Sequence, residues 1–401
     1  MKRSLNDLAI LGGVPAFEQK LHVGRPNLGN GERFIERTRD ILERRWFTNN
    51  GHYVQEFERA LATLLGVKHC IVMCNATVAL EITIRALDLT GEVIVPSFTF
   101  VATAHALQWQ EITPVFCDID PATHNLDPGR VEELISPHTT GIIGVHVWGR
   151  PCPVKALSAI AAKHDLKLMF DAAHAFACSH NGKMIGGFGR AEVFSFHATK
   201  FFNTFEGGAV ATNDDTLAEK IRLMKNFGFK GQDNVIYIGT NGKMTEISAA
   251  MGLTGLESLD EFIAANRANY EAYRQALNAI PGLRVVTYDS REQCNYHYVI
   301  VEVDEEVAGI SRDELANVLR AENVLARRYF YPGCHRMEPY RSQLPDASSR
   351  LPQTERLTRR VLSLPNGNSL TTAERDGVCE LIRYAAANGS KIRSALPTQP
   401  R

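Results

Sequence analysis

Short apolar runs alternate with segments of helical periodicity between about residues 55 and 225. Near-continuous apolar strands that alternate with helices are typical of a mostly parallel sheet covered on both faces. We therefore predict an α/β fold with a mostly parallel seven-stranded sheet between helices, and a ligand site at the carboxyl ends of the strands. The strands are expected at 70–74, 93–95, 114–117, 142–147, 166–170, 193–196 and 209–211. The intervening helices are expected at 78–87, 100–109, 154–164 and 216–224.

The pattern changes after about residue 255. A long helical stretch at 258–277 precedes a strand-like segment at 296–303, and further helices are expected at 312–322 and 372–387. A chain of 401 residues exceeds what one hydrophobic core usually fills. We predict a large domain over residues 1–255, which includes the N-terminal segment, and a smaller α+β domain over 256–401. Residues from 388 onward are expected to form a frayed tail.

Composition narrows the classes of partner. The chain has 44 basic and 45 acidic residues and a formal net charge of -1, which provides no field for binding nucleic acid or an anionic membrane. No apolar run approaches the roughly 18 residues that span a bilayer. The eight cysteines include no CxxC pair, and the histidines show no metal-ligand spacing. We expect a cytoplasmic protein without a metal, a membrane or a nucleic-acid partner.

Lys200 is the first candidate for chemistry. A strand expected to end near Ser195 is followed, five residues later, by Lys200 in a polar turn beside Phe201 and Phe202. An amine that loses water beside aromatic rings has a lowered pKa and is more often the neutral nucleophile. A lone lysine is usually an ordinary surface residue, so other features must decide between the two interpretations.

Asp171 is the second candidate. It ends the apolar run 166–170, which places a carboxylate at the carboxyl end of a strand, where a sheet of this type builds its site. A carboxylate there can hold a proton on a heterocyclic nitrogen by opposite charge. The alternative is that Asp171 caps a helix over 172–177, and the spacing alone favours neither interpretation.

Two further segments are compatible with a flat, phosphorylated ligand. Asn75, Ala76 and Thr77 lie between a strand and a helix, where backbone amides and the helix dipole suit an anion, although Asn75 as a plain N-cap is the simpler interpretation. Ser195 is a possible further phosphate donor. Phe100, in the segment Pro-Ser-Phe-Thr-Phe after a strand, can stack on a flat ring, although such a residue is more often part of the core.

Taken in order, these motifs resemble a known family. The order Asn75-Ala-Thr, Pro96-Ser-Phe-Thr-Phe, Asp171-Ala-Ala-His, Ser195-Phe-His-Ala-Thr-Lys and Glu206-Gly-Gly is similar to that of the DegT/DnrJ/EryC1/StrS nucleotide-sugar aminotransferases. The resemblance covers about residues 11 to 381 and implies the fold type I of enzymes that use pyridoxal 5′-phosphate. It is greatest toward members that aminate C4 of a dTDP-4-keto-6-deoxyglucose, in segments such as 144–151 and 331–335.

The resemblance also implies a role for each matching residue. Lys200 would bind the cofactor as a Schiff base and act in catalysis, and Asp171 would hold the pyridine nitrogen. The remaining positions would contact the cofactor ring or phosphate: Ala76, Thr77, Phe100, His174, Ser195 and Asn241. Many members have Ser-Gly-Thr where this chain has Asn75-Ala76-Thr77, a change we expect to be tolerated because backbone amides bind the phosphate. The family asparagine that matches Asn241 usually comes from the partner subunit, so a homodimer with shared active sites is expected.

The implied reaction converts dTDP-4-keto-6-deoxy-D-glucose and L-glutamate to dTDP-4-amino-4,6-dideoxy-D-glucose and 2-oxoglutarate. The family also contains dehydratases with histidine at the lysine position, and Lys200 favours transamination. Two alternatives remain open, amination at C3 of another keto-sugar nucleotide and a non-catalytic regulator with the same fold. An NAD-linked enzyme is disfavoured, because no GxGxxG follows an early strand with an acidic residue about 20 positions later.

Overall fold

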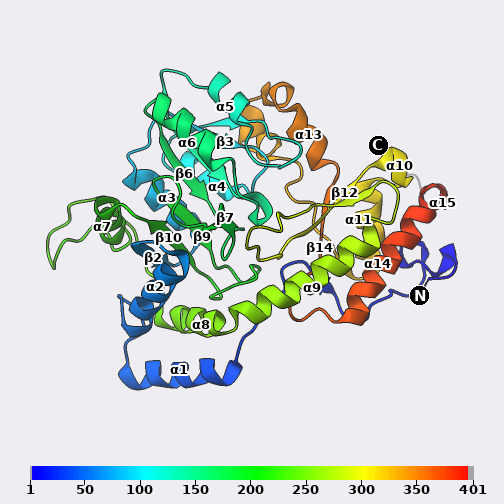
Figure 1. Ribbon diagram of the computed structural model, residues 1–401, viewed down its shortest axis with the longest axis horizontal. Helices are drawn as coiled ribbons and strands as arrows, with labels where there is room; N and C mark the ends of the chain where they lie inside the picture. Colours follow the sequence, from blue (N-terminus) through cyan, green and yellow to red (C-terminus); the bar gives the residue numbers. More distant parts are fainter. Residues whose placement is uncertain (1, 396–401) are drawn as a thin grey trace.

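A seven-stranded sheet is the largest sheet of the computed structural model, which describes residues 2–395, and its labelled strands lie in the left half of Figure 1. Its strand order is β2-β10-β9-β6-β5-β3-β4, and every pair is parallel except those of β10, which runs antiparallel to β2 and β9. The strands are β2 (His69–Met73), β3 (Glu92–Pro96), β4 (Thr113–Cys117), β5 (Thr139–Val145), β6 (Lys167–Asp171), β9 (Glu192–Ser195) and β10 (Gly208–Thr212). All seven predicted strands are confirmed, and no bound shifts by more than three residues.

Both faces of this sheet are buried, which explains why its strands are apolar almost without interruption. In β2, Ile71 and Met73 pack into one hydrophobic cluster, whereas Cys70 and Val72 pack into another on the opposite face. The first cluster contains side chains of α3 (Ala76–Ala86), α4 (Ala102–Gln108) and α7 (Asp215–Met224). The second contains those of α2 (His52–Leu65) and α8 (Glu246–Glu257). Farther along the sheet, α6 (Val154–Lys163) packs on Ile94, Ile142 and Leu168.

A second, antiparallel sheet follows in the C-terminal part of the chain. Its order is β11-β12-β14, with bounds Leu283–Val285, Val299–Val303 and Val361–Leu364. Figure 1 shows α9 (Leu259–Leu277) leading from α8 toward this sheet, where α11 (Arg312–Ala321) and α14 (Thr372–Ala387) also lie. The predicted strand at 296–303 and the three predicted helices are confirmed, although the strand begins later, at Val299.

The proposed domain boundary near residue 255 stays a prediction. It falls within α8, close to the point where α9 begins. The N-terminal segment pairs with the later part of the chain, because β1 (Leu21–His22) runs parallel to β13 (Val324–Leu325). The carboxylate of Glu322, which is buried, also accepts hydrogen bonds from the backbone amides of Ala9 and Ala16.

The prediction of a frayed tail from residue 388 is wrong for 389–395. These residues form α15 (Gly389–Ala395), with Ile392 buried in the main cluster. Gly389 is required there, since a Cβ atom would stand 2.3 Å from the carbonyl oxygen of Gly309. Residues 396–401, the rest of the expected tail, lie outside the described residues.

The remaining described elements are short or peripheral, apart from α1. They are α1 (Gly31–Arg44), α5 (Pro128–Glu133), β7 (Ser179–His180), β8 (Lys183–Met184), α10 (Glu305–Ala308), α12 (Tyr340–Gln343) and α13 (Pro352–Thr358). Five short 3-10 segments complete the described secondary structure. Among residues 2–395, no helix combines the length and hydrophobicity needed to cross a bilayer.

Candidate active site

Asp171 lies at the carboxyl end of β6, as predicted, and its carboxylate is held from two sides. The Thr103 hydroxyl donates to Oδ2 at 2.8 Å, and the Ala173 amide donates to Oδ1 at 3.0 Å. The side chain is buried. The helix considered for 172–177 does not form, because this stretch makes turns instead. The capping interpretation is therefore wrong, and Asp171 is a buried carboxylate with a fixed orientation.

Lys200 follows β9 and reaches toward the same edge of the sheet. Its Nζ lies 3.3 Å from the Tyr298 hydroxyl and 6.0 Å from the centre of the Tyr298 ring. Burial lowers the pKa of Lys200 to about 8, and the negative charge of Asp171 partly opposes this shift. The expected lowering of the Lys200 pKa is confirmed in direction. Near pH 8 about half of the amine is neutral and available as a nucleophile or base.

The lysine's surroundings differ from those expected from the sequence. Phe202 packs in the core against Phe57 and Phe196, with ring centres 6.2 and 5.1 Å away. The aromatic residue that contacts the amine is Tyr298, 98 positions later in the chain. Nothing in the local sequence around Lys200 indicates this contact, because it forms only when the segment before β12 packs against the large sheet.

His174 stacks within an aromatic group beside Lys200. Its ring centre lies 4.2 Å from that of Tyr298 and 5.8 Å from that of Trp148. The Trp148 amide donates to Nδ1 of His174 at 3.3 Å, which leaves Nε2 as the nitrogen that carries the hydrogen. Burial lowers the pKa of His174 well below its usual value, so the ring is neutral. His174 is therefore a neutral donor next to the amine.

His297 differs from two other buried histidines, His146 and His335. In each of those two, both ring nitrogens are hydrogen-bonded, which is typical of a residue that supports the fold. His297 is also buried, but its Nδ1 has no hydrogen-bond partner. Burial, together with the nearby charge of Lys200, lowers its pKa to about 3. A neutral nitrogen that lacks a partner beside the amine is typical of a site completed by a ligand.

The segment 75–77 forms the N-terminus of α3 at the same edge. The Asn75 side chain accepts from the Val78 amide at 2.8 Å, so Asn75 is the N-cap and the first helical residues are Ala76 and Thr77. Strand register brings Ser195 nearby, because Gly208 of β10 pairs with Met73 on one side and with Ser195 on the other. A Cβ atom on Gly208 would stand 2.7 Å from the Ala76 nitrogen, so only glycine permits this approach. The first backbone amides of α3 and the end of β9 at Ser195 thus form a cradle at this edge, and its use for a phosphate stays a prediction.

The two phenylalanines after β3 take different positions. Phe98 is fully buried and packs edge-on against Trp148 and Phe330, with ring centres 5.8 and 5.4 Å away. Phe100 is 59% exposed at the turn before α4, the element that carries Thr103. Phe100 is therefore not a core residue and remains available to cover a flat ring.

The family model that matches the chain is described as the DegT/DnrJ/EryC1/StrS aminotransferase family, and it matches residues 29–383. This chain belongs to that family. The chain is 42% identical to a dTDP-4-amino-4,6-dideoxy-D-glucose transaminase of Shigella dysenteriae over 316 residues, which are 79% of this chain and 86% of that protein. It is 35% identical to the Escherichia coli transaminase of the same name over 351 residues, which are 87% of this chain and 94% of that protein. The crystal structure of DesI in the presence of its TDP-sugar product matches with a TM-score of 0.93 and 49% identity, over 98% of this chain and 99% of that one.

Asn241 is the residue for which the family likeness predicts a contact with the cofactor phosphate of a partner subunit. It is exposed in the segment between α7 and α8, where its backbone bridges to Asn226. The next residue, Gly242, accepts a hydrogen bond from the Cys74 amide at 2.9 Å. Asn241 therefore lies near the end of its own chain's β2, and its expected contact with a partner's cofactor phosphate stays a prediction.

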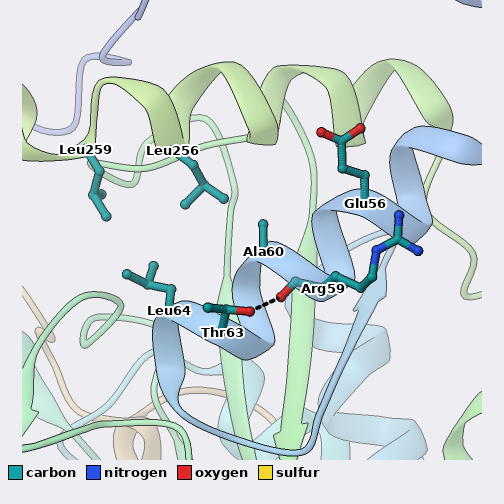
Figure 2. Close-up of a pocket in the computed structure, with 7 residues that line it drawn as sticks. All are labelled: Glu56, Arg59, Ala60, Thr63, Leu64, Leu256 and Leu259. Carbon is teal, nitrogen blue, oxygen red and sulfur yellow. Dashed lines mark hydrogen bonds between the residues drawn. The ribbon is translucent and has the colours of Figure 1, made fainter.

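A groove elsewhere on the molecule is distinct from this site (Figure 2). It lies where α2 meets the junction of α8 and α9, and its volume is about 540 Å³. It is lined by Glu56, Arg59, Ala60, Thr63, Leu64, Leu256 and Leu259. None of the eight residues predicted to act on the cofactor lines it. Among residues 2–395, no cluster of three or more His, Cys, Asp or Glu side chains has the arrangement of a metal site.

Proposed function

We propose that this aminotransferase uses pyridoxal 5′-phosphate to convert dTDP-4-keto-6-deoxy-D-glucose and L-glutamate to dTDP-4-amino-4,6-dideoxy-D-glucose and 2-oxoglutarate. One observation carries the proposal. At one edge of the parallel sheet, the buried carboxylate of Asp171 acts by its charge on the amine of Lys200, whose pKa is lowered. The names of the Shigella and Escherichia coli relatives support the sugar and its C4 position. The DesI structure with its TDP-sugar product supports the nucleotide.

The residues present fit the cofactor. The cradle at the start of α3 suits its phosphate, with donors from Ala76, Thr77 and Ser195. The Nδ1 of His297, which is buried without a hydrogen-bond partner and close enough to Lys200 to feel its charge, supports a ligand at this place. Phe100 would stack on the ring. When bound, pyridoxal phosphate accepts the electrons of a cleaved substrate bond into its protonated ring.

Each protein group then has a role that follows from its environment. Asp171, fixed by Thr103 and the Ala173 amide, holds a proton on the ring nitrogen by its charge. His174, a neutral donor through Nε2, is suited to the hydroxyl of the ring. Lys200 would hold the cofactor covalently, and its free amine would be the base for the proton of the substrate carbon. A pKa of about 8 suits that task near neutral pH, since the free amine is both present and basic.

The spectrum of the purified protein tests this function. The cofactor-loaded protein is expected to show an absorption band near the visible edge, and L-glutamate is expected to convert it to the shorter-wavelength band of the pyridoxamine form. Addition of dTDP-4-keto-6-deoxyglucose should restore the first band, and NMR of the product should place the amine on C4. An amine on C3 would establish the alternative carbon. A protein that binds no pyridoxal phosphate would instead support the non-catalytic regulator.

We further propose that the enzyme is a homodimer with shared active sites. Large apolar side chains are exposed on and after α1 and on the segment that carries Asn241, which is typical of a surface covered by another protein. They are Leu42 (59% exposed), Trp46 (57%), Phe47 (53%), Val235 (55%) and Ile238 (74%). Covering such a surface with a second copy would remove this apolar area from water.

Complementation between two impaired variants tests the shared sites. Lys200→Ala and Asn241→Ala are each expected to be impaired alone, the second through weaker phosphate binding. If Asn241 serves the partner's site, a heterodimer of the two variants contains one intact site out of two. Co-expression in equal amounts should then recover about a quarter of wild-type activity per site, because half of the dimers are mixed. Activity no higher than the average of the two separate variants would contradict the shared site.

A further inference from the structure

The Tyr298 hydroxyl makes a contact with the reactive amine that the functions proposed above do not use. Tyr298 immediately precedes β12 and is 4% exposed. Its hydroxyl lies 3.3 Å from Nζ of Lys200. Among residues 2–395, this hydroxyl makes no other hydrogen bond. The contact joins a residue of the segment before the small sheet to a residue that follows β9 of the large sheet.

The Tyr298 ring is held in place by its neighbours. The rings of His174, His297 and Trp148 lie 4.2, 4.6 and 5.4 Å from it, centre to centre. Its backbone is anchored as well, because the Tyr288 hydroxyl donates to the Tyr298 carbonyl at 2.6 Å. Because the Tyr298 ring is tightly packed, its hydroxyl cannot move together with the amine of Lys200. The hydroxyl therefore defines one position to which that amine returns.

The protonation states around Lys200 suit this contact. Burial raises the pKa of Tyr298 well above its usual value, so the phenol stays neutral. A neutral phenol accepts a hydrogen bond from an ammonium group and donates one to a neutral amine. The other titratable groups that act on Lys200 or face Tyr298 are Asp171, which is charged, and His174, His297 and Tyr329, which are neutral.

We propose that Tyr298 is a positioning residue that holds the amine of Lys200 in place after its release from the cofactor and stabilises its protonated form. This inference rests on the proposed function, in which Lys200 first binds the cofactor and then moves a proton. Tyr298 keeps its own proton throughout, so the balance of the reaction is unchanged. Its contribution is to keep the base within reach of the substrate carbon, where small displacements reduce the rate strongly.

The variant Tyr298→Phe tests the inference, because it removes the hydroxyl and keeps the ring. Hydrogen bonds to charged groups are stronger than those between neutral groups, so loss of the phenol disfavours the ammonium form more than the amine. The pKa of Lys200, about 8 in the wild type, is therefore expected to fall, by about one unit. The pH dependence of Lys200 labelling by an amine reagent, followed by mass spectrometry of the cofactor-free protein, measures this shift.

The loaded enzyme provides a second readout. With saturating L-glutamate, kcat of Tyr298→Phe is expected to fall about 10- to 100-fold, because the base is less well placed. KM for L-glutamate is expected to stay within about twofold, since the phenol contacts the lysine and not the donor. The acidic limb of the kcat profile against pH should move to lower pH with the Lys200 pKa.

Tyr329→Phe is the matched control for the titration. Its ring centre lies 6.3 Å from that of Tyr298, and its hydroxyl makes no hydrogen bond to Lys200 among the described contacts. It is expected to leave the Lys200 titration unchanged. The inference is overturned if Tyr298→Phe titrates like the wild type with unchanged kcat, or if both variants shift the pKa equally. If the wild-type protein does not bind pyridoxal phosphate through Lys200, the proposed function fails instead.

Discussion

Replacing Lys200 by alanine is expected to reduce transamination by about 10²- to 10⁴-fold, the contribution typical of a positioned general base. The amine that we propose to bind the cofactor and to move the substrate proton is then missing, and no other described lysine hydrogen-bonds to Tyr298 in its place. The loaded variant should also lack the absorption band of the lysine-bound cofactor. Single-turnover kinetics with L-glutamate, monitored at the wavelengths of both cofactor forms, measure the loss.

Two controls separate the chemistry from general damage. Lys183→Ala removes an exposed lysine on the short β7–β8 hairpin and should leave both spectrum and rate unchanged. A small primary amine such as methylamine, added to Lys200→Ala, should recover part of the rate by replacing the missing base. If Lys200→Ala keeps the wild-type spectrum and rate, another residue carries the cofactor and the site assignment is wrong.

Replacing Asp171 by asparagine is expected to lower kcat by about 10²- to 10⁴-fold. Breaking a buried charge pair costs about 3–5 kcal/mol, and each 1.36 kcal/mol in the barrier is a factor of ten. Asparagine is close to isosteric with aspartate and can still accept from the Ala173 amide, so the fold should persist while the charge is lost. Steady-state kinetics at saturating substrate, together with a thermal melt of the variant, distinguish these effects.

The charge itself can be tested through the cofactor. Asp171→Ala leaves more room at the ring nitrogen than asparagine does. A cofactor analogue methylated on that nitrogen carries a permanent positive charge, so it should restore part of the activity of Asp171→Ala. Thr103→Val is the matched control for orientation, because it removes only the hydroxyl that donates to Asp171 and should cost far less. Equal losses for Thr103→Val and Asp171→Asn would show that geometry, and not charge, dominates.

The large sheet is predictable because its signal is local. Strands buried on both faces must be apolar at nearly every position, as Ile71 and Val72 are, and they therefore stand out as runs in the sequence. The site residues at strand ends follow from the same runs, because parallel strands deliver their carboxyl ends to one edge. Asp171 and Ser195 were placed this way, and the structure brings both to that edge.

Two contacts within the site have no comparable signal in the local sequence. Thr103 orients Asp171 across 68 positions, and Tyr298 contacts Lys200 across 98. Each is an ordinary residue in its own segment, a threonine inside a helix and a tyrosine before a strand. The frayed tail was a wrong prediction for a similar reason, since the polar segment around Ile392 is ordered by packing against Gly309 and the main cluster.

By itself the sequence determined which elements form, their order and which residues at the strand ends carry reactive groups, because hydrophobic periodicity and strand-end chemistry depend on neighbours along the chain. The tertiary structure alone decided how those groups are tuned. The lowered pKa of Lys200, the fixed carboxylate of Asp171 and the neutral His174 arise from burial and from contacts with residues remote in sequence. Burial and long-range contact are properties of the packed chain, which no local pattern encodes.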